Sequence, residues 1–271
     1  MTRSAFVSIA LALLGLAAPA SGVVTFPSGD LTLHGVVYKP AGPGPFPAVL
    51  FNHGSAPGMY SQEAFDAIGP LFTRQGWIFF APWRRGQGLS SDAGPYIGDQ
   101  ITQAVTEGGM SAGASAMVHL LETDHLHDQL AGLAWLRNQP FVDRNRIAVM
   151  GNSFGGVETL FGAEKEDYCA AVDIAGGAES WTLAPQLQAA MTRAASHSKA
   201  PIFFLQAEND YSTAPSKVLS EVARNAGKTA EMKIYPAFGK SAQEGHSISY
   251  KGASIWQPDA LKFLEKNCKA H

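Results

Sequence analysis

The sequence has few charged residues, and its basic residues are scattered. Of its 271 residues, 16% are charged and 46% are hydrophobic, which is typical of a chain that folds around a packed core. The formal net charge is −3 and no lysine- and arginine-rich cluster occurs, so a nucleic-acid partner is not expected. Beyond the N-terminus no apolar run approaches the roughly 20 residues of a membrane span. Internal repeats and low-complexity linkers are also lacking, which indicates a single domain.

The first twenty residues have the features of a secretory signal peptide. Arg3 supplies a positive charge, residues 5–18 form an apolar run, and small residues precede a cleavage site after Ala20. The run is shorter than the roughly 20 apolar residues of a comfortable membrane span. We therefore predict a cleaved signal peptide over residues 1–20 and a secreted or periplasmic mature chain. An uncleaved N-terminal anchor is the alternative.

The mature chain, residues 21–271, alternates short apolar strands with helices. Strands are expected over residues 31–38, 47–51, 77–81, 146–150, 170–175, 202–205 and 232–235. Helices are expected over residues 61–75, 114–138 and 259–269. This alternation predicts an α/β fold with a mostly parallel sheet that is covered by helices on both faces. Residues 84–113 are rich in glycine and serine and predict a long loop or partly helical lid, so that a lid-like region lies near residues 84–128.

The pattern Gly-x-Ser-x-Gly occurs twice, around Ser111 and around Ser153. In a chain with 28 glycines the pattern alone does not choose between them. The motif works where a strand turns sharply into a helix, because this turn lifts the serine hydroxyl above the sheet. Ser153 follows the apolar strand at 146–150 and precedes a segment that can form a helix, whereas Ser111 lies in a flexible stretch without a preceding strand. We therefore predict Ser153 as a nucleophile.

A serine nucleophile needs a general base, and the base needs an acid that orients it. Both are expected after the serine in the chain, on loops at the carboxyl ends of strands. Asp210 follows the strand at 202–205 and His246 follows the strand at 232–235, which is the expected order. Glu208 is the alternative acid, but Asp210 leaves more residues for the loop to curl over the sheet.

Backbone N–H groups are expected to stabilise the oxyanion that such a nucleophile creates. One is the N–H of Phe154, directly after the predicted nucleophile. The second is expected from the loop after the strand at 47–51, and we assign it to Ser55, with Gly54 as the alternative. His53 then holds this loop and is not a second base.

These motifs together resemble the α/β-hydrolase superfamily, in particular its dienelactone hydrolase-like branch, and they are similar to the catalytic domains of prolyl-oligopeptidase-type enzymes. The shared features span residues 25–268 and are residues 51–54 (FNHG), 82–90 (PWRRGQGLS), Asp128 with 133–136 (LAWL), 142–147 (VDRNRI), 151–156 (GNSFGG), Asp210 and His246. Dienelactone hydrolases proper carry a cysteine nucleophile where this chain has Ser153, so their substrate is not carried over.

The resemblance implies a serine hydrolase that cleaves a carboxylic ester of a small molecule through an acyl-enzyme, with no metal or organic cofactor. A serine peptidase or amidase with the same machinery is the alternative, and a non-catalytic binding protein on a hydrolase scaffold is the third hypothesis. The substrate pocket is expected from residues 84–128 and 177–198, with Trp83, Tyr96, Met110 and Trp181 as candidates.

The chain has two cysteines, Cys169 and Cys268, and both lie in the mature part. In a hydrolase of this fold, the strand at Ala170 begins at the end of the sheet opposite the active site. The C-terminal helix runs back toward that same end. The two cysteines are therefore predicted to form a disulfide, which export would permit, and two buried free thiols are the alternative.

Overall fold

The computed structural model describes residues 20–55 and 62–270. Residues 1–19, and with them nearly all of the predicted signal peptide, lie outside the described part, so the signal peptide stays a prediction. Within the described part, no helix combines the length and the apolar character that crossing a membrane requires.

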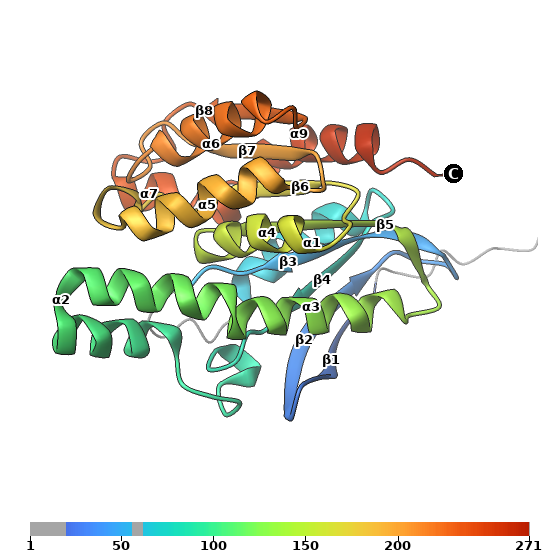
Figure 1. Ribbon diagram of the computed structural model, residues 1–271. Helices are drawn as coiled ribbons and strands as arrows, with labels where there is room; N and C mark the ends of the chain where they lie inside the picture. Colours follow the sequence, from blue (N-terminus) through green and yellow to red (C-terminus); the bar gives the residue numbers. More distant parts are fainter. Residues whose placement is uncertain (1–19, 56–61, 271) are drawn as a thin grey trace, which may run out of the picture.

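The described residues form a sheet of eight strands that is mostly parallel, and its parallel character was predicted (Figure 1). Its strands are β1 (Ala20–Ser28), β2 (Leu31–Lys39), β3 (Phe46–Asn52), β4 (Ile78–Pro82), β5 (Val142–Asn152), β6 (Ala171–Ile174), β7 (Ile202–Ala207) and β8 (Ala230–Tyr235). Their order across the sheet is β1-β2-β4-β3-β5-β6-β7-β8. Strands β3 to β8 pair in parallel, and β1 and β2 form an antiparallel edge.

Strand β1 is the strand of the described sheet that the sequence pattern did not predict, and helices α5 and α6 were not predicted either. It pairs with β2 through a tight turn in which Gly29 has a φ of +58°. The strand lies at the edge of the sheet and is buried on one face, with Phe26 in the core and Val23 exposed. A half-buried edge strand lacks the continuous apolar run that marks the central strands.

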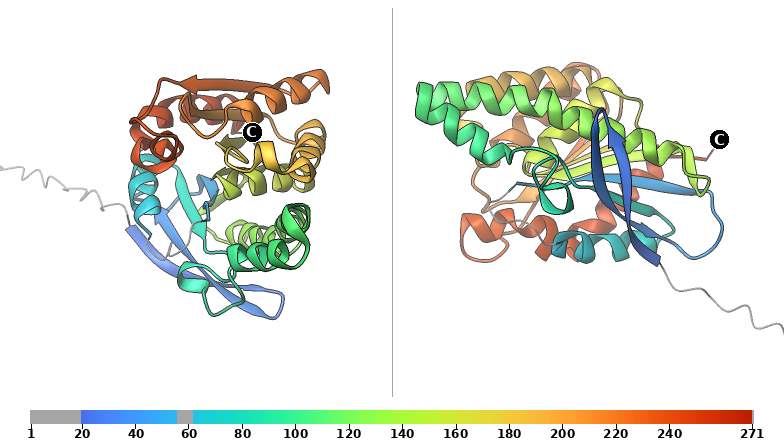
Figure 2. Two further views of the ribbon diagram at one scale, coloured as in Figure 1. Left: turned by 90° about the vertical axis from the view of Figure 1, so that its left-hand side faces the viewer. Right: turned by 90° about the horizontal axis from the view of Figure 1, so that it is seen from below.

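Helices cover both faces of the sheet (Figures 1 and 2). The elements are α1 (Glu63–Thr73), α2 (Ile97–Glu122), α3 (Asp124–Arg137), α4 (Phe154–Lys165), α5 (Pro185–His197), α6 (Ala214–Asn225), α7 (Ala242–His246), α8 (Ile248–Lys251) and α9 (Ala253–Asn267). Alternate residues of a strand serve opposite faces. Ala48 and Leu50 thus pack in the core under α2 to α6, and Val49 and Phe51 pack in the core under α1, α8 and α9.

The predicted lid region is more helical than the sequence suggested. Helix α2 begins at Ile97 and folds back at Gly109, whose φ of 77° and ψ of −175° interrupt the helix. The two halves of α2 form antiparallel arms that project beyond the sheet (Figure 1). A Cβ on Gly113 would collide with Val105 on the other arm, so this glycine lets the arms pack closely. Each arm is covered on one side only, so it needs few apolar residues. The resulting low hydrophobicity, together with the frequent glycines, had indicated a loop.

The predicted disulfide between Cys169 and Cys268 is present and joins residues 99 positions apart. Cys169 lies two residues before the start of β6, and Cys268 directly follows α9. The backbone N–H of Cys169 donates to Ile147 O at 2.9 Å, and Arg146 Nε donates to Cys268 O at 2.8 Å. The bond therefore fastens the last helix to the centre of the sheet.

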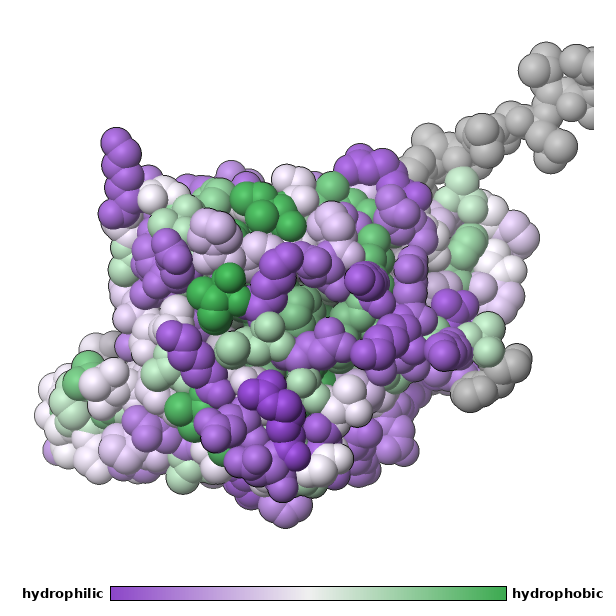
Figure 3. Space-filling model, turned by 90° about the horizontal axis from the view of Figure 1, so that it is seen from above, coloured by the Kyte–Doolittle hydropathy of each residue, from purple (hydrophilic) through white to green (hydrophobic). Residues whose placement is uncertain are grey.

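The surface above β8, α6 and α9 is mostly hydrophilic. Figure 3 shows its hydrophobic residues as small patches among hydrophilic ones. Val218, Met232 and Ile255, from these three elements, are among the exposed large hydrophobic residues. Other exposed hydrophobic residues, among them Met110 and Leu183, belong to the cavity that is described next.

Candidate active site

Ser153 lies at the sharp turn between β5 and α4, as the motif predicts. Its φ of 56° and ψ of −122° are unusual for a residue with a side chain, and such a conformation costs about 1–3 kcal/mol. Backbone hydrogen bonds to the neighbouring strand β6 and within the start of α4 hold the turn in place. The Ser153 N–H donates to Ile174 O at 3.0 Å, and the Ser153 carbonyl accepts from Gly156 N–H at 2.9 Å.

Two glycines of the motif are required by close backbone contacts. A Cβ on Gly151 would collide with the carbonyl oxygen of Gly155, and a Cβ on Gly155 would collide with the carbonyl oxygen of Asn52. The elbow and the end of β3 therefore approach each other more closely than larger residues would allow.

The register of the sheet brings the loop after β3 beside the elbow. Asn52 lies opposite Gly151, so the loop residues Gly54 and Ser55 continue alongside the nucleophile turn. The N–H of Gly54 donates to the side-chain oxygen of Asn152 at 3.1 Å. Among the described residues, no acceptor is recorded for the N–H of Ser55 or of Phe154. The N–H of Gly54 is therefore already engaged, and the assignment of the second oxyanion donor to Ser55 stays a prediction.

Asp210 and His246 come together although 36 residues separate them. His246 Nδ1 lies 2.9 Å from Asp210 Oδ1, which also accepts the N–H of Tyr211 at 2.7 Å. The Asp210 side chain is fully buried, and the His246 side chain is 18% exposed. Glu208 is exposed, and the structure joins Asp210 and not Glu208 to the histidine. This contact places a proton on Nδ1 and leaves Nε2 free to accept one.

Asn209, a residue that sequence reasoning missed, fastens the two loops together. Its Nδ2 donates to Phe238 O at 3.1 Å and to Ser241 O at 3.0 Å, while its Oδ1 accepts from Phe238 N–H at 2.8 Å. Ser241 in turn caps α7, the short helix that ends at His246. The amide therefore sets the position of the histidine relative to the acid. Its place directly before Asp210 was the available signal.

The buried guanidinium of Arg84 holds the loop after β3. Its Nη1 donates to His53 O at 2.6 Å, and its Nη2 donates to Gly54 O at 3.1 Å and to Ser55 Oγ at 2.6 Å. One side chain thus contacts three consecutive loop residues. His53 remains neutral because burial and the nearby Arg84 lower its pKa, and its ring supports the loop through Gly54 O at 2.6 Å.

Arg84 also pairs with Glu158 of α4, whose Oε2 lies 2.6 Å from Nη1. Both side chains are almost completely buried. Burial raises the pKa of Glu158 to about 7, because lost solvation outweighs the attraction of Arg84. Helix α4 begins with Phe154, so this ion pair links the two segments that carry the predicted oxyanion donors. Arg84 lies in the motif of residues 82–90, but neither Arg84 nor Glu158 was assigned a role from the sequence.

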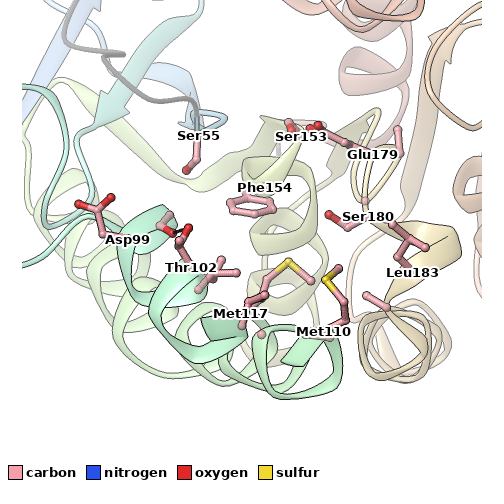
Figure 4. A pocket seen from close by; sticks show the side chains of 18 of the residues that line it. Ser55, Asp99, Thr102, Met110, Met117, Ser153, Phe154, Glu179, Ser180 and Leu183 are labelled. Atoms are coloured by element: carbon pink, nitrogen blue, oxygen red, sulfur yellow. Dashed lines mark hydrogen bonds between the residues drawn. The ribbon is translucent and has the colours of Figure 1, made fainter. Parts of the chain in front are cut away.

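A cavity of about 430 Å³ opens beside Ser153. Figure 4 shows Ser55 and Ser153 at one end, Met110 and Met117 at the other, and the ring of Phe154 between them. Both arms of α2 and the segment 177–184 form its walls.

Not all of the residues that were predicted for the pocket line it, and the serine of the second Gly-x-Ser-x-Gly pattern lies away from an elbow. Tyr96 and Met110 line the cavity, whereas Trp83 and Trp181 are packed in the core. Ser111 lies within α2 and contacts Gln186 at 3.0 Å, far from any strand-to-helix turn. In the part of the chain that the structure describes, no group of three or more His, Cys, Asp or Glu side chains is arranged to hold a metal ion.

The parallel sheet and the serine at a strand-to-helix elbow define a hydrolase of the α/β-hydrolase fold. More specifically, the chain belongs to the dienelactone hydrolase family, whose sequence model matches residues 33–263.

Solved structures of several hydrolases share the fold. An acylaminoacyl peptidase of Pyrococcus horikoshii is 21% identical with a TM-score of 0.66, and the match covers 96% of this chain and 44% of the peptidase. A protein of Klebsiella pneumoniae that is named as a dienelactone hydrolase is 20% identical with a TM-score of 0.65. This match covers 92% of this chain and 100% of that protein. An esterase of Pyrococcus furiosus is 16% identical with a TM-score of 0.66, and the match covers 93% of this chain and 94% of the esterase. This chain thus spans less than half of the peptidase.

Proposed function

We propose that the protein is a serine hydrolase that cleaves a carboxylic ester of a small molecule through an acyl-enzyme at Ser153. The observation that carries this proposal is the position of Ser153, at a strained elbow that opens on a cavity. Hydrolysis of this kind needs a base, an orienting acid and two oxyanion donors. His246, Asp210 and the N–H groups of Phe154 and Ser55 are the groups that fit these roles.

The base and acid act as a pair in the proposed mechanism. His246 Nε2 takes the proton of Ser153 Oγ as the oxygen attacks the acyl carbonyl carbon. Asp210 holds the Nδ1 proton and stabilises the imidazolium that forms. The same imidazolium then protonates the leaving alcohol, and a water molecule activated by His246 hydrolyses the acyl-enzyme.

The oxyanion is stabilised by two amides from different segments. Phe154 N–H is the first N–H of α4, where the helix has no internal acceptor for it. Ser55 N–H comes from the loop that Arg84 and His53 hold. Two preorganised donors at the developing charge lower the barrier without reorganisation during the reaction.

A serine peptidase is the second candidate, because an acylaminoacyl peptidase shares the fold over nearly the whole of this chain. The same groups would serve amide cleavage. Ester and amide substrates therefore separate the two candidates.

The experiment compares turnover of 4-nitrophenyl acetate and of acylated peptide 4-nitroanilides by the wild type, Ser153→Ala and Ser111→Ala. Ser111→Ala is the matched control because Ser111 lies in the same sequence pattern. We expect kcat on the ester to fall by about 10⁴-fold or more in Ser153→Ala and to be unchanged in Ser111→Ala. Full activity of Ser153→Ala would refute the assignment, and faster anilide turnover would favour the peptidase.

Export of the chain is a further part of the proposal. The disulfide is of the kind that forms in oxidising compartments, and residues 1–20 have the pattern of a cleaved signal. Mass spectrometry of the protein recovered outside the cytoplasm is expected to give an N-terminus at Ser21. A chain that retains residues 1–20 would contradict cleavage.

A further inference from the structure

Among the described residues, the lining of the cavity includes the nucleophile and does not include the base. Its described lining contains Ser153, Phe154 and Ser55, but not His246. In acyl transfer the histidine protonates the leaving group, so the leaving group must lie on the histidine side. The acyl group, whose carbonyl oxygen points to the oxyanion donors, then extends away from the histidine and into the cavity.

The far part of the cavity is apolar and adaptable. The first arm of α2 contributes Ile101 and Val105, and the second arm contributes Met110 and Met117. Leu183 approaches from the opposite wall, as Figure 4 shows. Methionine side chains are flexible and fill irregular space around varied apolar groups. A volume of about 430 Å³ falls within the range of roughly 300–1,000 Å³ that accommodates drug-sized ligands.

The charged side chains in the described lining of the cavity are both acidic. Asp99 and Glu179 line it, and no lysine, arginine or histidine belongs to the lining that the structure describes. Both carboxylates are exposed. The nearby Arg84 is buried behind the oxyanion loop and is already engaged with Glu158. An acyl group that ends in a carboxylate would therefore meet repulsion and no counter-charge.

We propose that this cavity is the acyl-binding site and that it selects an uncharged hydrophobic acyl chain of medium length. The proposal rests on the proposed function and adds the substrate class to it. The hairpin of α2 is then the specificity element, because it supplies most of the apolar wall.

The first test measures kcat/KM on 4-nitrophenyl acetate, butanoate, hexanoate and octanoate, which share one leaving group. Each buried methylene adds up to about 4-fold in affinity. We expect kcat/KM for hexanoate to exceed that for acetate by at least about 10-fold. The full gain per methylene is not expected, because the acyl chain is only partly buried. If the enzyme hydrolyses the acetate ester but kcat/KM stays constant or falls as the acyl chain lengthens, the proposed acyl selectivity is overturned and the proposed function remains intact. Unchanged turnover in Ser153→Ala would instead refute the function.

A matched pair of variants tests where the chain binds. Thr102 and Thr106 are both exposed, lie one turn apart on α2 and donate to the carbonyl four residues before, but only Thr102 lines the cavity. Thr102→Trp is expected to lower the hexanoate-to-acetate ratio by at least about 10-fold through lost methylene contacts, whereas Thr106→Trp leaves it unchanged. Equal ratios in the two variants would place the acyl chain elsewhere and overturn the proposal.

The charge selectivity has its own test. Mono(4-nitrophenyl) adipate and 4-nitrophenyl hexanoate have acyl chains of the same length and differ by a terminal carboxylate. We expect the adipate ester to be hydrolysed at least about 10-fold less efficiently at low salt, where surface charges are least screened. Glu179→Gln is expected to narrow this difference. Equal or better hydrolysis of the adipate ester would refute selection for an uncharged chain.

Discussion

The buried guanidinium of Arg84 is expected to set the geometry of the oxyanion site, and Arg84→Met tests this role. The substitution keeps most of the side-chain volume but removes the donors to His53, Gly54 and Ser55. It also leaves Glu158 buried without its partner. Two consequences follow, one for stability and one for activity.

The stability loss is expected to be large. Removing one member of a buried ion pair typically costs about 3–5 kcal/mol, because the other charge stays buried without compensation. Glu158 is fully buried and lies 2.6 Å from Arg84. Adding Glu158→Gln to Arg84→Met removes the stranded carboxyl and is expected to recover part of the loss. Urea unfolding of the two single variants and the double variant measures this coupling.

The loss of activity is expected to appear in kcat. Removing one oxyanion donor lowers kcat by about 10²–10³-fold in a well-studied serine protease. A loop that is no longer held at three residues keeps its donor less well aligned, so we expect kcat on 4-nitrophenyl acetate to fall by about 10²-fold. KM is expected to change little, because the walls of the cavity are formed by α2 and the segment 177–184.

The adjacent Arg85 provides the matched control. It makes a two-pronged contact with Asp128, with Nε 2.9 Å from Oδ2 and Nη2 2.7 Å from Oδ1. None of its recorded contacts is with the oxyanion loop. Arg85→Met is therefore expected to lower stability while kcat stays within about 3-fold of wild type, a difference below 1 kcal/mol. If the two variants lose kcat equally, Arg84 stabilises the fold and does not position the oxyanion donors.

Three further predictions concern the sheet and its ends. Burial raises the pKa of Asp173 from 3.8 to about 7, so the stabilising contribution of this carboxyl is present below pH 4 and is lost as pH rises through about 7. Asp173→Asn should therefore raise the free energy of unfolding at pH 8 by on the order of 4 kcal/mol. Urea titrations should also show that the free energy of unfolding of this variant depends less on pH. Replacing Cys169 and Cys268 by serine opens a loop of 99 residues and should lower stability by about 4–5 kcal/mol with kcat unchanged, whereas unchanged unfolding curves would contradict this. Gly155→Ala should abolish ester hydrolysis because its methyl would collide with Asn52 O, and wild-type kcat in a folded variant would show that the elbow can relax.

Local sequence patterns predicted much of the fold. The central strands are continuous apolar runs because both of their faces are buried, and this signal needs no knowledge of partners. The elbow at Ser153 was also predicted, since a strand, a glycine-bounded serine and a helix are adjacent in the chain. Asp210 was chosen over Glu208 from its loop position, and the structure places Asp210 in contact with His246.

Contacts between distant segments escaped the sequence analysis. Arg84 and Glu158 are 74 residues apart, and neither lies in a pattern that reveals its partner. The first arm of α2 was interpreted as a loop or partly helical lid because Ile97 is its only buried residue, whereas the second arm was predicted to be helical from Ala114 onward. The edge strand β1 was missed because only one of its faces is buried.

The amino-acid sequence by itself determined the α/β class, the elbow at Ser153 and the order of the residues that follow it, because apolar runs and tight turns are local properties of the chain. Only the tertiary structure decided what holds the loop after β3 and where the cavity lies. These features depend on strand register and on side chains that meet across the sheet. If β3 shifted by one residue in its pairing with β5, so that Asn52 no longer lay opposite Gly151, every side chain of the shifted strand would turn to the other face of the sheet.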